Sequence, residues 1–197
     1  MLYLLVILLA IILGVLVGTV KKRKFDISCI TLEKVWLAFI AFGIQTVTRI
    51  LSMKGLVFIA KYSQITQGVV FTLLFIVLWY NRKHLGLWII ALGASLNALV
   101  MMVNGGRMPV SLEKLEKVDM PEFIELLKSG ADNKHIVMSE LTKLNFLADI
   151  FYIPGFLGKG AYVLSIGDYI VAVGLFVFVL EMINSSYKKT CEADIKI

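Results

Sequence analysis

Five long apolar blocks constrain this chain of 197 residues more than any other feature. A run of about 20 apolar residues is long enough to cross the hydrocarbon core of a bilayer as an α-helix. In that core a segment of this length satisfies its backbone polar groups within a helix. The sequence therefore predicts an all-α, polytopic membrane protein with five transmembrane helices. The expected spans are residues 2–20, 32–51, 62–80, 85–103 and 162–183.

The composition supports a membrane protein and argues against a partner made of nucleic acid. The chain is 59% hydrophobic and 17% charged, whereas soluble domains carry about a quarter charged residues. The net charge is +6, but the basic residues gather at the ends of the apolar blocks, as in KKRK at 21–24 and NRKH at 81–84. That placement is typical of membrane topology. We therefore expect the lipid bilayer as a partner, and no nucleic acid.

The distribution of lysine and arginine predicts the orientation in the membrane. Connections 21–31 and 81–84 and the tail 184–197 are basic, whereas 52–61 is weakly basic and 104–161 is nearly neutral. Because basic connections stay in the cytoplasm, we expect the amino terminus outside and the carboxyl terminus inside. The first span lacks a preceding basic segment and a small-residue cleavage site, so we expect it to stay as a helix instead of being removed as a signal peptide.

The long connection before the fifth span has the pattern of a folded segment. Residues 120–130 predict a short amphipathic helix with Pro121 in its first turn. Residues 139–151 predict another, with Ser139 as its cap and leucines every third residue. We expect both helices to lie as a lid on the outer membrane surface. The predicted divisions are four spans in 1–103, the extracytoplasmic helical loop 104–161, the fifth span 162–183 and the cytoplasmic tail 184–197.

Several polar residues fall inside the spans, where an arginine or aspartate costs about 2.5–3.5 kcal/mol on insertion scales. Gln45 and Arg49 are four residues apart and share one helix face. Asn97 and Asn104 are seven apart and also share a face. Asp168 lies roughly 10 Å along the fifth span. In the expected topology all of them lie in the outer half of the membrane, on the same side as the long loop.

Two interpretations of these residues stay open. In the structural one, Arg49 or Arg107 pairs with Asp149 or Asp168 to hold helices together, or Arg49 extends to the headgroups. Asp168 is also a candidate helix cap, together with Ser165. In the functional one, the same residues form a site for a ligand or for catalysis at the outer face.

The corner NGGRMP, residues 104–109, has two interpretations as well. A helix commonly ends at a glycine in the left-handed conformation, and Pro109 prevents its continuation. Alternatively, the amides of Gly105 and Gly106 face an anion, with Arg107 adding positive charge. The corner is no Walker loop, because no GK[ST] follows it.

His135 is either an ordinary surface residue of the loop or an acid–base group acting with Asp149 and Asp168. No motif of a metalloprotease, a serine hydrolase or a paired-carboxylate enzyme occurs. Cys29 and Cys191 have no ligand spacing, so no metal site is indicated. The sequence names no cofactor.

The second half of the chain resembles a family of small bacterial multi-spanning membrane proteins of unknown function that share an N-G-G-x-M-P motif. The resemblance rests on NGGRMPVS at 104–111, His135, TKLNFLADI at 142–150 and SIGDYIVAVG at 165–174. It implies a multi-pass protein of the bacterial inner membrane. It carries no activity, cofactor or catalytic residue, but it implies that these pieces belong together.

The sequence favours a non-enzymatic role, in which the outer face binds an anionic lipid headgroup, a small molecule or a partner. The alternatives are a membrane-embedded lipid-modifying enzyme, which would use His135 or Asp149 with Asp168, and a small transporter subunit. The oligomeric state is not indicated. The candidate ligand-binding residues are Asn104, Gly105, Gly106, Arg107, Asp149, Asp168, Arg49, Gln45, Asn97 and His135.

Overall fold

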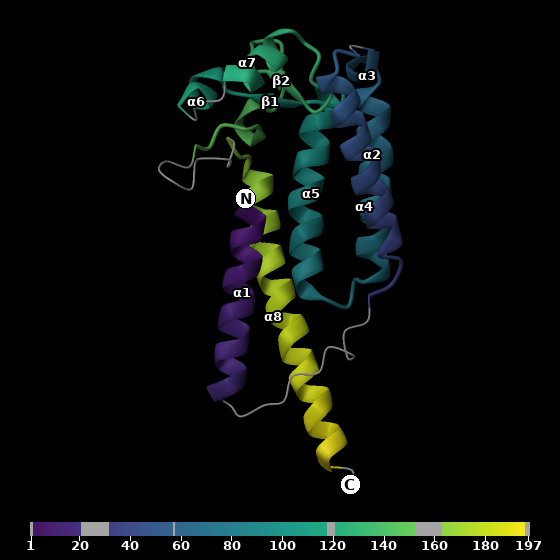
Figure 1. Cartoon of the computed structure of the whole chain (residues 1–197), viewed down its shortest axis with the longest axis vertical. Helices are drawn as coiled ribbons and strands as arrows, with labels where there is room; N and C mark the ends of the chain where they lie inside the picture. Colours follow the sequence, from purple (N-terminus) through teal and green to yellow (C-terminus); the bar gives the residue numbers. More distant parts are fainter. Residues whose placement is uncertain (1, 21–31, 57, 118–120, 153–162, 196–197) are drawn as a thin grey trace.

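The computed structural model describes residues 2–20, 32–56, 58–117, 121–152 and 163–195. Five of its helices are long and apolar enough to cross a membrane, which confirms the predicted all-α fold with five candidate spans (Figure 1). The remaining elements are short and lie mainly between the fourth and fifth of these helices. The five long helices are α1 (Leu2–Val20), α2 (Trp36–Met53), α4 (Ser63–Tyr80), α5 (Leu85–Val103) and α8 (Ile166–Ile195).

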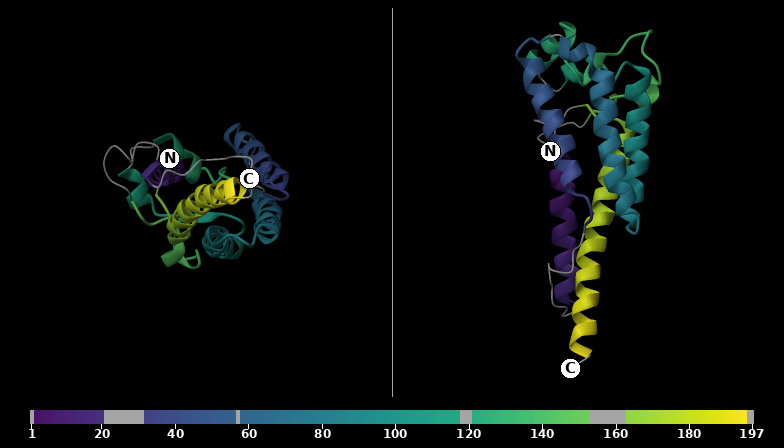
Figure 2. Two further views of the ribbon diagram at one scale, coloured as in Figure 1. Left: turned by 90° about the horizontal axis from the view of Figure 1, so that it is seen from below. Right: turned by 90° about the vertical axis from the view of Figure 1, so that its right-hand side faces the viewer.

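The long helices pack as an open row and not as a closed bundle. Neighbouring pairs are α1 with α8, α8 with α5, α5 with α4, and α4 with α2 (Figures 1 and 2). Large apolar side chains on all five helices stay exposed, among them Phe39, Ile65 and Leu92. An apolar surface of that extent suits contact with lipid tails and not with water.

Glycines bring α5 and α8 into close contact. Gly93 and Gly86 on α5 lie against Gly167 and Gly174 on the antiparallel α8. A Cβ added at Gly93 would stand 2.6 Å from the carbonyl oxygen of Gly167, and one at Gly174 would stand 2.9 Å from that of Gly86. Small residues at such spacing let two membrane helices approach until their backbones touch. The α5–α8 pair therefore forms the tightest described helix contact in the row.

The short elements form a cap on one end of the row, which we define as residues 104–152 and 163–165 where they are described (Figure 1). Strands β1 (Met108–Val110) and β2 (His135–Val137) pair in parallel, with Met108 opposite His135. Asp149 extends this sheet through a parallel bridge to Val110. The other elements are α6 (Leu112–Glu116), α7 (Pro121–Lys128) and the 3₁₀ turn η2 (Asn145–Leu147), and α3 (Phe58–Lys61) lies beside the cap.

The predicted amphipathic helix at 120–130 is present as α7. Its apolar face carries Phe123 and Leu127, which pack with Val110, Leu115 and Val163 in a small core. The apolar face is thus covered by the sheet and α6, not by a second amphipathic helix.

The helix predicted over 139–151 is wrong. The chain there forms turns and η2, because side chains compete for the backbone groups that a helix would use. Thr142 Oγ1 accepts from the Ser139 amide (3.0 Å) and donates to the Ser139 carbonyl (2.7 Å). Asn145 Nδ2 donates to the same carbonyl at 3.2 Å. Leu144 then takes a left-handed conformation with φ of 56°, which ends any right-handed turn.

At the opposite end of the row is the base, defined as residues 32–35 and 81–84. Asn81 is buried and clamps the backbone of Glu33: its Oδ1 accepts from the Glu33 amide at 2.9 Å and its Nδ2 donates to the Glu33 carbonyl at 2.8 Å. Lys34 follows with a φ of 55°. This bent entry is the reason why α2 begins at Trp36 and not near residue 32, as the hydropathy pattern predicts.

Candidate functional site

The interior of the cap holds a line of ionisable side chains. Arg49, on the last turns of α2, pairs with Asp132 at the start of the segment that leads into β2. His135 Nδ1 lies 3.4 Å from Asp132 Oδ2, and His135 Nε2 lies 3.9 Å from Asp149 Oδ2. The order in space is therefore Arg49, Asp132, His135, Asp149.

Local turn chemistry places Asp132 in this line. Its Oδ1 accepts from the amides of Lys134 (2.8 Å) and His135 (3.2 Å), which is the Asx-type turn that aspartate favours. The Ser52 hydroxyl donates to the carbonyl of Ala131, so α2 is tied to the cap at two adjacent places. The side chain of Asp132 is completely buried. Burial opposes its ionisation, but the His135 bond, the Arg49 charge and the Lys134 amide together hold its pKa well below the ordinary value.

His135 is held in one orientation by its surroundings. The Phe123 ring meets the imidazole edge to face with centroids 5.3 Å apart, and the Arg49 guanidinium lies 5.3 Å from the centre of the same Phe123 ring. Burial lowers the pKa of His135, and Lys134 and Arg49 add to this, against the opposing effect of Asp132. His135 is therefore a neutral imidazole near pH 7 and no exposed loop residue.

Asp149 is the far end of the line and is also buried. Its backbone is fixed by β1, because its amide donates to the Pro109 carbonyl (3.0 Å) and its carbonyl accepts from the Ser111 amide (3.1 Å). Its Oδ1 has no hydrogen-bond partner. Burial, followed by the negative charge of Asp168, raises the pKa of Asp149 well above its ordinary value, with Lys134 acting against this. The raised pKa favours the protonated, neutral form of Asp149.

Arg107 differs from Arg49 in having no acidic partner among the residues that the structure describes. Its Nε is buried without a hydrogen-bond partner, as is Oδ1 of the nearly inaccessible Asn133. Arg107 lies between Gly106 and the first residue of β1. Among the described residues, Arg107 thus has neither an acidic partner nor a hydrogen-bond acceptor for its buried Nε. An anion at this place would be stabilised by both the charge and the donor.

The corner before Arg107 is a glycine-terminated helix end. Gly105 and Gly106 have φ values of 69° and 82°, and the Gly106 amide donates to the Met101 carbonyl at 2.7 Å. That bond is the 6→1 bond of a Schellman motif. A Cβ on Gly106 would stand 2.3 Å from backbone atoms of Ser63 and Gln64, so only glycine fits there. The structural interpretation of the two glycines therefore has direct geometric support.

Asn104 anchors the turn segment of the cap. Its Oδ1 accepts from the Lys143 amide (2.8 Å), and its Nδ2 donates to the carbonyls of Lys143 (2.9 Å) and Val100 (2.8 Å). All polar atoms of its side-chain amide are in use. Asn104 thus has a structural role in this conformation.

Asp168 and Asn97 form a second polar cluster at the level where α1, α5 and α8 meet. Ser165 and Asp168 cap the start of α8 reciprocally, each side chain accepting from the other's amide at 3.0 Å. Asn97 Nδ2 donates to Asp168 at 3.1 Å, and Asn97 Oδ1 accepts from the Ser165 hydroxyl at 2.9 Å. The Tyr3 hydroxyl donates to Asp168 at 2.8 Å. The predicted capping role of Asp168 is present.

The expected pairing of an arginine with Asp149 or Asp168 is wrong. Arg49 pairs with Asp132 instead, which the sequence reasoning did not select. Among the predicted residues, Arg49, His135 and Asp149 lie in one line, with Asp168 near enough to influence the charge of Asp149. The predicted residues outside that line are Gln45, whose Oε1 is buried and unpartnered on α2, and the already described Asn97, Asn104, Gly105, Gly106 and Arg107.

Asp132 and Asn133 are the functional candidates that the sequence did not reveal. The only local signal is an Asp-Asn pair two residues after Gly130, which indicates a turn and not an ion pair. Among the described residues, no group of three or more His, Cys, Asp or Glu side chains is arranged to hold a metal ion.

Comparisons with other proteins identify the family of this chain but no activity. Residues 29–180 match the model of a family of unknown function, DUF5317. An uncharacterised protein of Thermotoga maritima is 32% identical over 174 residues, which is 88% of this chain and 87% of the relative. No solved structure matches the chain. Since the family model covers residues 29–180, well over half of the chain, the chain belongs to the family of unknown function DUF5317.

Proposed function

We propose that this protein is a multi-pass protein of the bacterial inner membrane whose cap faces outward and binds a small anionic ligand at Arg107. The ligand is a phosphorylated headgroup or a small organic acid. The main supporting observation is that Arg107, unlike Arg49, has a partly buried positive charge with no acidic partner among the described residues. Asp132 is paired with Arg49, and the raised pKa of Asp149 favours its neutral form.

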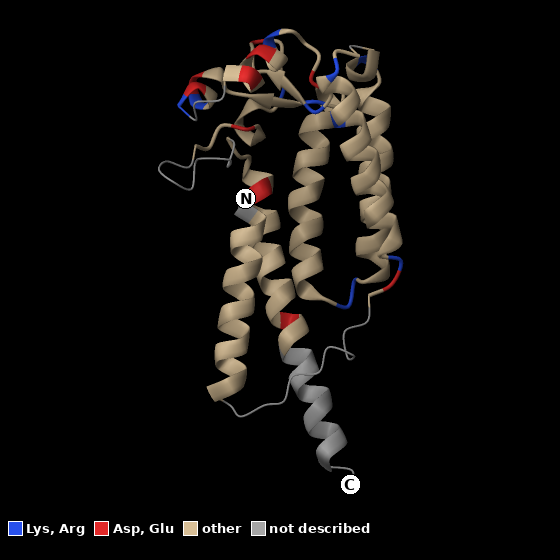
Figure 3. Ribbon diagram, in the orientation of Figure 1, with Lys and Arg blue, Asp and Glu red and all other residues tan. Residues whose placement is uncertain are grey.

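The charge distribution supports the outward orientation of the cap. Arg82 and Lys83 lie at the base, opposite the cap (Figure 3). The amino-terminal end of α1 is directed toward the cap, while α8 extends past the base at its carboxyl-terminal end (Figure 1). A basic cytoplasmic base with an outward amino terminus follows from the positive-inside rule.

The unpartnered polar groups support a ligand that accepts hydrogen bonds. Arg107 Nε is a free donor, and a protonated Asp149 also offers an O–H donor from its carboxyl group. Neither group repels a negative charge. A phosphate or carboxylate would therefore satisfy donors that are buried without a partner, at a gain of about 1.5–3 kcal/mol per charge-assisted bond.

The binding experiment uses glycerol 3-phosphate, a soluble phospholipid headgroup, with protein in zwitterionic nanodiscs and isothermal titration calorimetry. Native protein should bind, Arg107→Gln should weaken binding at least tenfold, and Arg107→Lys should restore part of it. Lys34→Gln, which removes a positive charge from the base outside any proposed site, should bind as the native chain does. Unchanged binding by Arg107→Gln, or no binding by native protein, would contradict the proposal. If Arg107→Gln and Arg107→Lys both lose the cap fold, Arg107 is a structural residue.

The orientation is tested by cysteine labelling. Leu141 is 91% exposed in the cap, so Leu141→Cys in a chain with both native cysteines replaced by serine gives one accessible thiol. A membrane-impermeant maleimide should label it from outside intact cells. Labelling only after the cytoplasm is opened would place the cap inside and overturn the outward site.

A second candidate function, a lipid-modifying enzyme, is favoured by the geometry at His135. A histidine with one nitrogen near Asp132 and the other 3.9 Å from Asp149 has the arrangement of an oriented acid–base group. The test is mass spectrometry of phosphatidylglycerol and phosphatidylethanolamine vesicles incubated with native protein and His135→Gln. A product that forms with both, or with neither, rejects catalysis by His135.

The transporter alternative has less support from the described residues. The polar side chains within the spans gather near the cap, while the base half of α1, α4 and α5 is largely apolar. A flux assay with reconstituted vesicles and glycerol 3-phosphate would reveal a path if one existed.

A further inference from the structure

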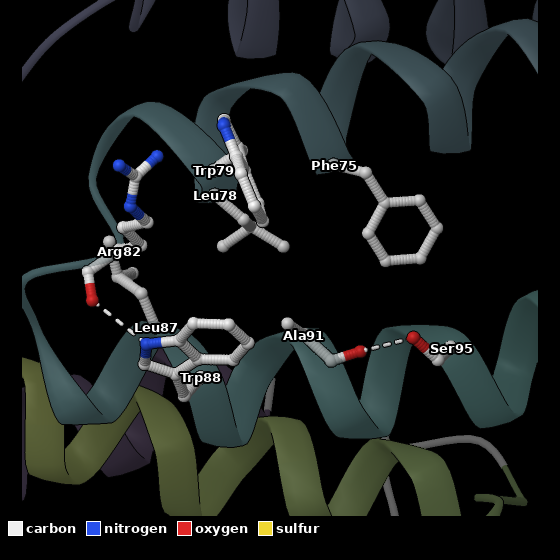
Figure 4. Close-up of a pocket in the computed structure, with 8 residues that line it drawn as sticks. All are labelled: Phe75, Leu78, Trp79, Arg82, Leu87, Trp88, Ala91 and Ser95. Atoms are coloured by element: carbon white, nitrogen blue, oxygen red, sulfur yellow. Dashed lines mark hydrogen bonds between the residues drawn. The ribbon is translucent and has the colours of Figure 1, made fainter.

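A groove between α4 and α5 lies on the lipid-facing side of the row near the base. It has a volume of about 170 Å³ and is open on one side. Figure 4 shows the Trp79 and Trp88 rings on its two walls, with Phe75 further along α4 and Arg82 at its end. Leu78 and Leu87 complete the apolar lining at that end. The groove is therefore an apolar slot that ends at a cation.

The polar groups of the groove are arranged so that only the guanidinium stays available. The Ser95 hydroxyl donates to the Ala91 carbonyl at 2.7 Å, and the Trp88 indole N–H donates to the Arg82 carbonyl at 2.8 Å (Figure 4). The Arg82 guanidinium lies over the Trp79 ring at 4.7 Å from its centre. The stacking orients this cation, as cation–π contacts with tryptophan do.

Arg82 has no acidic partner among the described side chains. Glu181, the acidic residue of α8 near the base, is already engaged, since its two oxygens accept from the amides of Leu85 (3.0 Å) and Gly86 (2.9 Å). Lys83, next in the chain, adds a second positive charge. The mouth of the groove thus carries two cations, and neither forms an ion pair with a described side chain.

The surroundings identify the occupant. Trp79 and Trp88 are 60% and 54% exposed although both are large and apolar, and in a membrane-spanning helix such exposure is toward lipid. Tryptophan near the end of a span lies at the headgroup level. An apolar slot at acyl-chain depth with an oriented arginine at headgroup depth is complementary in shape and charge to a phospholipid with a negative headgroup.

We propose that this groove binds an anionic phospholipid, with its phosphate on Arg82 and one acyl chain between Trp79 and Trp88. The site is at the opposite end of the molecule from Arg107, and it does not depend on the function of the cap. Its ligand is a membrane lipid, bound laterally from the bilayer.

The experiment uses fluorescence quenching by brominated lipids. Trp36 is replaced by Phe, so that Trp79 and Trp88 are the remaining tryptophans of the chain. The protein is reconstituted into phosphatidylcholine containing an equal mole fraction of brominated phosphatidylglycerol or brominated phosphatidylcholine. A single arginine near an anionic lipid is worth about 1 kcal/mol, which corresponds to an expected preference of about fivefold for phosphatidylglycerol.

Arg82→Gln should reduce this preference to about one, and Arg82→Lys should keep much of it. The matched control is Lys34→Gln, which removes a cation that lies 5.7 Å from the ring centre of Tyr80 at the same base but outside the groove. That variant should keep the native preference. Equal quenching by the two lipids in the native background, a preference that survives Arg82→Gln, or its loss in Lys34→Gln overturns the proposal. These outcomes do not depend on whether glycerol 3-phosphate binds at Arg107, because the two sites lie at opposite ends of the row.

Discussion

At both the cap and the base, an asparagine at the end of a helix binds the backbone of a crossing segment, but the structures held in this way differ. At the base, Asn81 ends α4 and clamps the amide and carbonyl of Glu33, while also donating to Val77 four residues back. At the cap, Asn104 ends α5 and clamps both backbone groups of Lys143 in the same way. In each case the next residue, Lys34 or Leu144, has a left-handed backbone.

The difference lies in what surrounds each clamp. At the base, the clamp holds a short entry into α2, and the cations there are exposed or lie on aromatic rings. At the cap, the clamp holds one edge of a folded unit whose charges are buried in the line from Arg49 to Asp149. An asparagine at a helix end therefore fixes a crossing chain at either end of the row. The cap differs from the base in its buried ionisable side chains, and for that reason the cap is the candidate functional end.

The largest expected effect would test that distinction directly. Asp132→Ala leaves Arg49 without its partner and the amides of Lys134 and His135 without an acceptor. Breaking a buried pair in this way costs about 3–5 kcal/mol. Amide hydrogen exchange should show lost protection at Met108 and Met138, whose amides bond across the cap. The control Glu113→Gln, at an exposed pair, should change little. If these amides stay protected in Asp132→Ala, the buried ion pair does not stabilise the cap.

The two clamps should differ in magnitude. Asn81 is 1% exposed, so Asn81→Ala leaves the Glu33 backbone groups unpaired away from water and should cost about 3 kcal/mol. Asn104 is more accessible, and water can replace part of its bonds, so Asn104→Ala should cost about 1.5 kcal/mol. Thermal unfolding in detergent measures both losses. Exchange should increase around Lys143 in the second variant alone, and equal effects at both ends would contradict the comparison.

Glu181 provides a smaller test at the base. Its carboxylate caps the first amides of α5, where a negative charge is favoured by the helix dipole. Glu181→Gln should lower the free energy of unfolding by about 1 kcal/mol, with increased exchange at Gly86 and no change in the cap. Loss of protection at Met108 would show that base and cap are not independent.

The smallest effects tested in the cap depend on pH. The lowered pKa of His135 means that its contribution to stability is fully present above about pH 6.5, its ordinary pKa, and decreases as the pH falls. The raised pKa of Asp149 acts in the opposite direction, since its contribution decreases as the pH rises from about 3.8 through the folded value. His135→Gln should remove the first dependence and Asp149→Asn the second. Exchange at Met138, corrected for its intrinsic rate, measures both, and a variant that carries both substitutions serves as the control.

The sequence predicted the membrane-spanning helices and α7 because their signals are local. Hydropathy over about 20 residues and a helical period over eight need no knowledge of distant contacts. The segment 139–151 defeated the same reasoning, since Thr142 and Asn145 capture the carbonyl of Ser139 and Leu144 reverses the turn. The spacing of Leu141, Leu144 and Leu147 is the same whether the segment forms a helix or the observed turns.

The candidate site was predictable in part. Arg49 and Asp168 stand out because charge is costly at membrane depth, and His135 and Asp149 stand out as ionisable residues of the long loop. Their pairing was not predictable. Arg49 and Asp132 are separated by 83 positions and come together only because α2 ends under the cap. The parallel sheet was hidden for a similar reason, since three-residue strands have too few positions to show a period.

The contact at Gly106 has a mechanical consequence. Backbone of the α5 terminal turn touches backbone of Ser63 and Gln64 at the beginning of α4, with no side chain between them to yield. β1 starts two residues later. We therefore expect a tilt of α4 to displace Arg107 and β1 with it, so that the packing of the long helices and the arrangement of the cap would change together.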